Sequence, residues 1–441
     1  MKRSTLFAFL SLILIICMLA PSCTDVPPAD PEALRTQEAI QDRGEQRVTY
    51  HEVFDPDRDY DNRFGRGDQS IVETENACYI LFNSIASGHN YLYYYDKATG
   101  EYGPLCAKPE CLHNDSSCNA MIDGRAGTLS YADGRLYYKV SLDDLRRGEG
   151  VAMGSCFSIA LDGADRRKEF EMPCEWENDP MCLYYHRGRF YGSSLVSTVK
   201  EGVPLRYISV TAWDAETGGY KLICGRDDCT CYAAPRLFFF GKYVYFCFDS
   251  YRGFEKYAGI KSTVELWRWD TEAERLEPVY IGEKGAARGC FYTLWAESQD
   301  CIYIAPNLPD PDGPLAVYRV GDSGLTEAYR FEGKGGGLSI LDGVFQRHYI
   351  REDERVFEVE LVDFDGSPIY SGELDMSFIG DEVPGAVFTS YFSSYGGRDG
   401  VYYAFIAEDG DGKEFVYIVK YEFSSPDAEP IRTMICADIY G

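Results

Sequence analysis

Three cysteines and one histidine form a dense set of potential metal ligands near the end of the first quarter of the chain. Cys106, Cys111, His113 and Cys118 follow the spacing Cys-x4-Cys-x-His-x4-Cys. Three thiolates and an imidazole bind Zn²⁺ tetrahedrally, and the His-x4-Cys end is like that of a zinc knuckle, although the usual Cys-x2-Cys half is missing. Pro109 would favour a turn joining Cys106 and Cys111 in a metal site or in a disulfide loop. The sequence therefore predicts a zinc site or local disulfides here, with reduced structural thiols as a third interpretation.

A second cysteine cluster partly repeats the first. Cys224, Cys229 and Cys231 have the spacing Cys-x4-Cys-x-Cys. The first cluster follows Asp96 and the second follows Asp214, at the same separation, and each of these aspartates opens a polar turn. We therefore expect both clusters in the same loop of two repeated units, the loop that leaves the outermost strand. The chain has 16 cysteines in all, and an exported protein usually oxidises some of them to disulfides.

No complete catalytic constellation is found. The string Gly-Asp-Ser-Gly at residues 321–324 matches a serine-protease nucleophile, but it coincides with a repeated polar turn and is interpreted as a hairpin. Asp55, Asp57, Asp59 and Asp61 alternate as calcium ligands do, yet the glycine and the glutamate of a calcium loop are absent. We expect a solvated acidic strand there, and we assign no catalytic residue.

The elements that must position these side chains are short strands in a repeat. Runs of aromatic and β-branched residues recur, and each contains one anchor aromatic. The anchors follow one another at a nearly constant interval, except for one shorter step from Tyr303 to Phe345. The seven anchors are Tyr79, Tyr137, Tyr191, Tyr245, Tyr303, Phe345 and Tyr402. Downstream of each anchor a second strand leads into a polar turn, for example Asp214–Gly218. Cys78, Cys247 and Cys301 stand beside anchors and are expected to be small buried hydrophobes.

Seven such units predict an all-β, seven-bladed β-propeller. Helical solenoids are excluded because the strands are dense in poor helix formers. Six or eight blades remain compatible with the one short step, and two packed β-sandwiches are the alternative architecture.

The N-terminus predicts export. Lys2 and Arg3 precede an apolar run over residues 6–20, which would rise only about 22 Å as a helix and is too short for a permanent span. The sequence Leu-Ala-Pro-Ser-Cys that ends at Cys23 looks like a bacterial lipobox. We expect a signal peptide at residues 1–22, a lipidated Cys23 with an acidic, proline-rich tether at 23–67, and the propeller at 68–441, at the outer face of the cytoplasmic membrane.

The charge restricts the partners. There are 71 acidic and 43 basic side chains, for a net charge of -28. Nucleic acid is excluded because phosphate binding needs a basic surface, and electrostatic docking on anionic lipid is disfavoured for the same reason.

Short motifs resemble known bacterial propellers. Residues 134–138, 157–167 and 361–367 are similar to blades of the low-density-lipoprotein-receptor-related and TolB types, and residues 105–113 look like a stretch of lipoproteins common in gut Clostridia. The resemblance covers nearly the whole mature chain and implies the propeller fold far more than any activity.

Three functions are compatible with these patterns. The preferred one is a membrane-tethered, non-catalytic binding or scaffold module for a protein, peptide or carbohydrate. The alternatives are a glycan-active hydrolase or lyase outside the cytoplasm, and a metal- or redox-responsive envelope protein built on the cysteine clusters.

Overall fold

The computed structural model describes residues 48–65, 70–83, 89–141, 154–172, 180, 182–200, 203–229, 234–250, 263–283, 290–307, 314–351 and 355–438. The expected signal peptide, Cys23 and the first part of the tether lie outside these residues. In the part of the chain that is described, no helix is long and apolar enough to cross a membrane.

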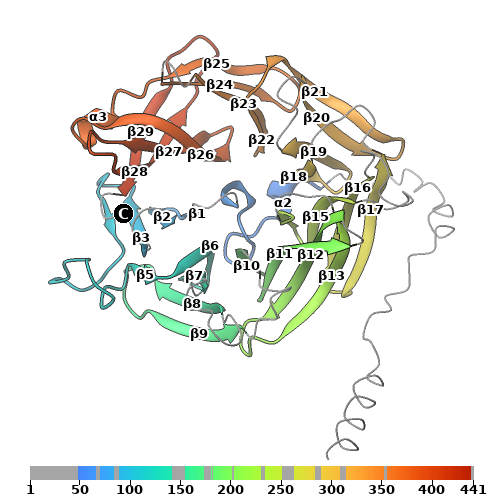
Figure 1. Ribbon diagram of the computed structural model, residues 1–441, viewed down its shortest axis with the longest axis horizontal. Helices are drawn as coiled ribbons and strands as arrows, with labels where there is room; N and C mark the ends of the chain where they lie inside the picture. Colours follow the sequence, from blue (N-terminus) through green and yellow to red (C-terminus); the bar gives the residue numbers. More distant parts are fainter. Residues whose placement is uncertain are drawn as a thin grey trace, which may run out of the picture. The chain divides into compact units, whose positions relative to one another are not determined.

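The strands form seven antiparallel blades in a ring, as the repeat predicts (Figure 1). Each blade is a consecutive stretch of chain that runs from the centre outwards. Blade 1 consists of β1 (Ser70–Glu73), β2 (Ala77–Asn83), β3 (His89–Asp96), β4 (Tyr102–Pro104) and β5 (Met121–Asp123); blade 2 of β6 (Arg125–Ala132), β7 (Arg135–Ser141), β8 (Gly154–Ala160) and β9 (Arg167–Met172). Blade 3 consists of β10 (Cys182–His186), β11 (Arg189–Lys200), β12 (Val203–Asp214) and β13 (Tyr220–Cys229); blade 4 of β14 (Leu237–Phe240), β15 (Tyr243–Ser250), β16 (Thr263–Asp270) and β17 (Arg275–Glu283). Blade 5 consists of β18 (Cys290–Ser298), β19 (Cys301–Asn307), β20 (Pro314–Gly321) and β21 (Gly324–Lys334); blade 6 of β22 (Gly337–Leu341), β23 (Val344–Arg351), β24 (Val356–Asp363) and β25 (Pro368–Leu374); blade 7 of β26 (Val387–Gly397), β27 (Gly400–Glu408), β28 (Glu414–Glu422) and β29 (Ile431–Asp438). A short helix, α3 (Ile379–Glu382), links the last two blades.

Each anchor aromatic lies on the second strand of its blade, and each polar turn joins the third strand to the fourth. The spacing therefore located all seven blades, including the one after the short step. The string at 321–324 is the β20–β21 hairpin, in which Gly321 pairs with Gly324, so its interpretation as a turn is confirmed. Cys78, Cys247 and Cys301 are buried as expected.

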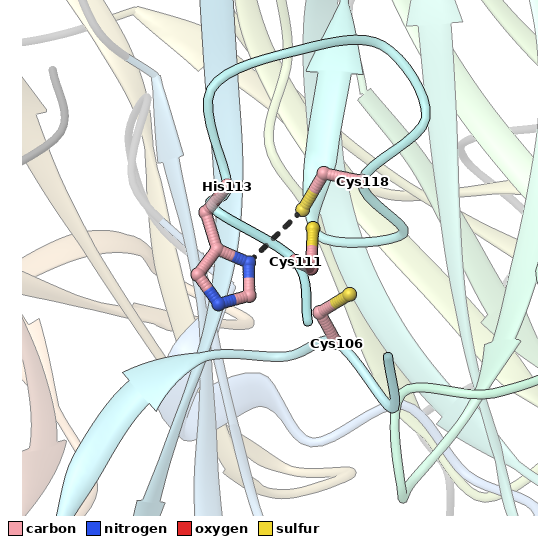
Figure 2. Close-up of side chains that lie close together, drawn as sticks. All are labelled: Cys106, Cys111, His113 and Cys118. Atoms are coloured by element: carbon pink, nitrogen blue, oxygen red, sulfur yellow. Dashed lines mark hydrogen bonds between the residues drawn. The ribbon is translucent and has the colours of Figure 1, made fainter. Parts of the chain in front are cut away.

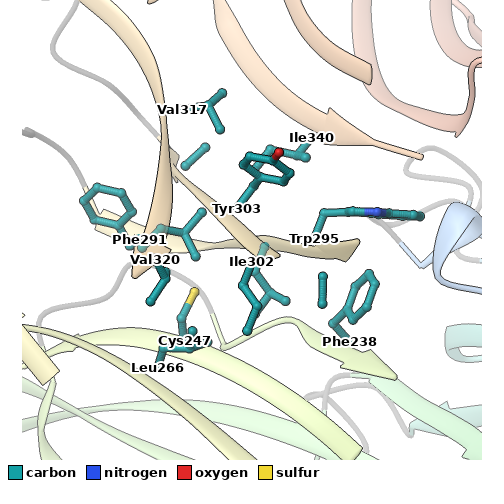
Figure 3. Packing of buried hydrophobic residues seen from close by; sticks show 14 of the residues in the cluster. Phe238, Cys247, Leu266, Phe291, Trp295, Ile302, Tyr303, Val317, Val320 and Ile340 are labelled. Carbon is teal, nitrogen blue, oxygen red and sulfur yellow. The ribbon is translucent and has the colours of Figure 1, made fainter. Parts of the chain in front are cut away.

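The core lies between the blades. A large cluster joins blades 4, 5 and 6: Ile302 points towards Leu266 of blade 4, whereas Tyr303 on the same strand points towards Ile340 of blade 6 (Figure 3). Aromatic and β-branched side chains fill this space because both faces of an inner strand are covered by neighbouring sheets. Blades 3 and 4 are also joined by backbone pairing, since Cys229 of β13 pairs with Ser250 of β15.

A segment before the first blade crosses the centre of the ring (Figure 1). We call residues 48–65 the strap; it contains α2 (Tyr50–Val53) and the 3-10 helix η1 (Asn62–Phe64). Its buried aromatics enter three different places. The ring of Tyr50 lies against Phe238 and Trp295, Tyr60 lies against Tyr184 and Phe239, and Phe64 lies against Tyr402.

Hydrogen bonds fix the strap to blades 3 and 4. The side-chain amide of Asn62 donates to the carbonyl oxygen of Phe239 at 2.7 Å and accepts from its N–H at 2.8 Å, as a neighbouring strand would. Nδ1 of the buried His186 accepts from the N–H of Tyr60 at 3.3 Å, while Nε2–H donates to the carbonyl of Gly241 at 2.8 Å. Burial lowers the pKa of His186 to about 4, so this histidine is neutral and can accept.

The strap corrects two expectations. Composition predicts a tether for residues 48–65, but they pack on the blades because buried aromatic side chains are interspersed among the acids. The acidic stretch is neither a strand nor fully solvated: Asp59 is 5% exposed and its carboxylate receives two hydrogen bonds from the guanidinium of Arg187, at 2.6 and 3.1 Å. A paired carboxylate can be buried where a lone one cannot.

Candidate metal centre

The outermost strand of blade 1 is interrupted, and the interruption carries the predicted metal ligands. β4 and β5 both pair antiparallel with β3, β4 along Tyr93–Tyr95 and β5 along His89–Tyr91. Together they occupy the place of one fourth strand. The chain between them, residues 105–120, leaves the sheet and is called the cysteine loop here. Its ends are held on β3, because the N–H of Leu105 donates to the carbonyl of Leu92 and the N–H of Leu92 donates to that of Ala120.

Blade 2 supports the cysteine loop from outside. The carbonyl of Gly163, in the β8–β9 turn, accepts from the N–H of Ala107 at 3.3 Å and from the side-chain amide of Asn119 at 2.8 Å. Arg166, in the same connection, donates to the carbonyl of Met121 at 2.6 Å and to that of Cys118 at 3.4 Å. The position of the loop is therefore set by two blades.

The four predicted ligands come together. One ligand atom from each of Cys106, Cys111, His113 and Cys118 lies within 4.8 Å of all the others, and Nδ1 of His113 is 3.3 Å from Sγ of Cys118 (Figure 2). Tetrahedral Zn–S bonds of about 2.3 Å place two sulfur atoms about 3.8 Å apart. A contraction of about 1 Å or less would bring this set to zinc geometry.

The backbone turns so that the histidine can reach the sulfurs. His113 has a φ of 55°, in the left-handed region that a non-glycine residue seldom adopts. Its carbonyl accepts a hydrogen bond from the hydroxyl of Tyr91 at 3.1 Å, and Cys111 closes a turn by donating its N–H to the carbonyl of Lys108 at 3.1 Å. A strained backbone held by hydrogen bonds indicates that the orientation of this side chain is specified.

Backbone amides face two of the sulfurs. Burial opposes ionisation of Cys106, but hydrogen bonds from the backbone at Lys108 and Asn119 outweigh it and lower the pKa of this thiol. For Cys118 burial dominates and raises the pKa to about 12, although the backbone at Ala120 and Met121 acts in the opposite direction. Amides directed at sulfur stabilise the thiolate form that binds metal, and outer-shell bonds of this kind tune metal sites.

Four protein ligands leave no coordination position for a substrate. Cys3His is a ligand set of structural zinc sites, whereas catalytic zinc keeps three protein ligands and an open position. The arrangement is therefore suited to holding the loop in shape.

The other predicted cysteine positions differ from expectation. Cys224 and Cys229 lie within β13, a strand of 10 residues, and not in a loop beyond it. β4 has only three residues before its loop, so the shared spacing marks the outermost strand in both blades but a loop only in the first. Cys231 and the lipobox residue Cys23 lie outside the described residues. None of the cysteines whose side chains are described is in a disulfide.

The sequence did not reveal the residues that support the centre. Gly163 lies in one of the polar turns of the repeat, but nothing in its spacing links that turn to a loop of the preceding blade. Arg166 reaches the loop only through the packing of blade 2 on blade 1, and Tyr91 reaches it through strand pairing within blade 1; the spacing of the sequence specifies neither contact.

No model of a protein family matches the chain, and no curated protein matches it. Solved propellers are similar in structure. The β-propeller domain of the Trilobed protease from Pyrococcus furiosus has a TM-score of 0.44 at 10% identity, with 86% of this chain and 96% of that chain covered. An oligogalacturonate lyase in complex with manganese has a TM-score of 0.44 at 12% identity, covering 86% and 90%. The acylaminoacyl peptidase of Pyrococcus horikoshii has a TM-score of 0.46 at 10% identity, covering 85% of this chain and 54% of that one.

At this level of similarity the comparisons concern the fold alone. The chain is a seven-bladed β-propeller. The resemblance to clostridial lipoproteins and to TolB-type propellers stays a prediction.

Proposed function

We propose that this chain is an exported, lipid-anchored β-propeller that serves as a non-catalytic binding scaffold, with a structural zinc centre in its first blade. The observation that carries the zinc centre is the convergence of Cys106, Cys111, His113 and Cys118, whose ligand atoms lie within 4.8 Å of one another. Zinc would bind the three thiolates and the imidazole and would fix a loop that has few backbone hydrogen bonds of its own.

Two features support a scaffold over an enzyme. A Cys3His ligand set fills all four coordination positions of zinc and leaves none for a substrate. The strap crosses the centre of the ring, where the inner strands converge, and its aromatics are buried there. A ligand is therefore expected on the outer surfaces of the propeller.

Metal analysis tests the zinc centre. Purified full-length protein should retain about one equivalent of zinc through dialysis, because four protein ligands bind structural zinc tightly. Cys118→Ser removes a buried ligand and should lower the zinc content to near zero. Metal content by plasma mass spectrometry and intact mass give the readout.

Cys182→Ser is the matched control, since Cys182 is half-buried on β10 and lies outside the cluster. It should keep its zinc. If the wild-type protein contains no metal and its intact mass is lower by pairs of hydrogen atoms, the cysteines form disulfides and the proposed zinc centre is wrong.

The anchor and the binding role need separate tests. In a bacterial host, a clickable fatty acid should label the wild type and not Cys23→Ser, while Cys17→Ser should leave labelling unchanged.

For the binding role, soluble propeller should bind members of a glycan or peptide array without altering them. Measured turnover of any bound glycan would overturn the non-catalytic assignment.

A further inference from the structure

Among the described residues, blade 1 is built only from residues 70–123 and blade 7 only from residues 387–438, and no described strand of one blade joins the sheet of the other. The contact between these two blades, which we call the seam, therefore depends on side-chain packing and on side-chain hydrogen bonds. Here β29 lies against β3 and β4, and the hydroxyl of Tyr102 on β4 donates to Glu382 of α3 at 3.3 Å.

The cysteine loop belongs to the core of the seam. One buried cluster contains Ile80 and Tyr93 of blade 1 together with Ile418 and Ile435 of blade 7. Cys118 and Ala120 of the loop are members of the same cluster, and the side chains of Cys106 and Cys111 pack against it. Three of the four metal ligands thus contact the apolar layer that holds the first and last blades together.

Blades 1 and 2 hold the ends and the outer side of the loop, but few backbone hydrogen bonds within the loop define its own shape. Between β4 and β5 its backbone forms isolated turns, such as those closed by the N–H groups of Cys111 and Cys118. Fixing the backbone of each residue costs conformational entropy, and isolated turns recover little of it. A metal bound at four points of a loop this short would supply the constraint, since metal binding and local folding are linked.

We propose that the metal acts as a latch of the seam: its presence holds Cys118 and Ala120 in the cluster, and its loss loosens the packing of blade 7 on blade 1. This inference rests on the proposed zinc centre. Binding or loss of the metal would thereby control how tightly blades 1 and 7 pack together where the ring closes.

Buried thiols within the chain can report on the seam. Cys78 on β2 and Cys436 on β29 are 1% and 0% exposed and belong to the seam cluster. Cys247 and Cys301 are equally buried, at 0% and 2%, but lie in the cluster of blades 4, 5 and 6 (Figure 3 shows Cys247). The second pair is an internal control, because it reports on loosening of the whole molecule.

The experiment measures alkylation of these thiols in the full-length protein. Zinc-loaded, chelator-treated and zinc-restored samples are pulsed with N-ethylmaleimide under native conditions, and modification of each cysteine is followed by peptide mass spectrometry. Metal loss should raise the rates at Cys78 and Cys436 roughly tenfold or more, leave Cys247 and Cys301 within about twofold, and be reversed by zinc.

Two variants sharpen the test. Cys111→Ser should behave like the chelated protein, whereas Leu112→Ser, on the same loop with a side chain 77% exposed, should behave like the zinc-loaded wild type. If the protein binds zinc but the seam thiols react at unchanged rates, or if all four buried thiols accelerate together, the latch is wrong and the zinc centre stands. A protein that takes up no zinc overturns both.

Discussion

Gly163 shows how one residue of blade 2 constrains the proposed metal centre. Its φ is 78°, and a Cβ added there would lie 2.7 Å from the backbone nitrogen of Cys106 and 2.9 Å from the carbonyl oxygen of Leu105. Contacts this short with backbone atoms cannot be relieved by rotation of a side chain. The residue must be glycine because of both its conformation and its neighbour.

We expect Gly163→Ala to lower the free energy of unfolding by roughly 2–4 kcal/mol and to weaken zinc retention, because the cysteine loop must move away from the β8–β9 turn. Urea unfolding together with metal analysis measures both effects.

Gly134→Ala is the matched control for this change. Gly134 has a similar φ of 74°, but a Cβ there would have no neighbour within 4 Å. This variant should lose only about 1 kcal/mol, the cost of the left-handed conformation, and keep its zinc. Equal effects of the two variants would show that crowding on the cysteine loop does not matter.

At this scale the sequence predicted the cluster of potential ligands but not the residues that support it. Residue type and spacing were sufficient for Cys106, Cys111, His113 and Cys118, because ligands close in sequence can meet through local turns. Spacing does not specify how three sulfurs and an imidazole converge, so the sequence left zinc and disulfides both open. Gly163 belongs to another blade, and so its role required the tertiary structure.

At the scale of elements, the strap is the main departure from the sequence analysis. Its composition is that of a linker, with many acids, and its three buried aromatics, separated by 10 and 4 residues, are too sparse to indicate a strand or a helix. No periodic pattern is expected, since each aromatic enters a different site on the ring. The presence of Tyr50, Tyr60 and Phe64 in an otherwise polar segment was the available signal.

Asn62→Ala should lower the free energy of unfolding by about 2–4 kcal/mol, because it removes two hydrogen bonds and leaves a buried N–H and carbonyl of Phe239 without these partners. Denaturant unfolding followed by tryptophan fluorescence is suitable, since Trp295 lies beside the strap.

Asp57→Ala serves as the comparison within the strap. The side chain of Asp57 is exposed, and its removal should change stability by no more than about 0.5 kcal/mol. Should the two variants prove indistinguishable, the strap does not stabilise the ring.

At the scale of the whole molecule, the repeat predicted the fold class and the number of blades. Anchors and turns recur because every blade packs against its neighbours in the same way, and the same contacts require similar residue types at similar spacing. How the ring closes was not predictable, because closure occurs once in the molecule and leaves no repeat. It involves residues as distant in sequence as Glu73 and Tyr402, whose carboxylate and hydroxyl meet at 3.0 Å.

Tyr402→Phe should therefore destabilise the protein by roughly 1–2 kcal/mol, the net contribution of a hydrogen bond to a charged group. Lys97 also binds this carboxylate at 2.9 Å, so Glu73 keeps one partner and the loss stays moderate. Thermal or urea unfolding at neutral pH measures the effect.

Tyr417→Phe on the adjacent strand is the control, because the buried hydroxyl of Tyr417 has no hydrogen-bond partner among the residues that the structure describes. Its removal should be neutral or slightly stabilising.

The pH dependence of stability gives a second check on the role of Glu73. Burial alone would raise the pKa of Glu73, but hydrogen bonds and charge from Lys97, Tyr402 and Arg63 outweigh burial and lower this pKa. The stabilisation is thus complete above the ordinary glutamate pKa and is lost as the pH falls through the lowered pKa of the folded state. A loss from Tyr402→Phe that is undiminished at low pH would argue against a role for this carboxylate.

The strap also bears on how such a chain can change over generations. Because each blade is one uninterrupted stretch of sequence, duplication or loss of a stretch could add or remove a blade without rethreading the others. The aromatics of the strap, however, are spaced to reach particular gaps around a circle of seven. A ring of six or eight blades would place Tyr50, Tyr60 and Phe64 opposite the wrong gaps between blades. The strap therefore disfavours a change in the number of blades.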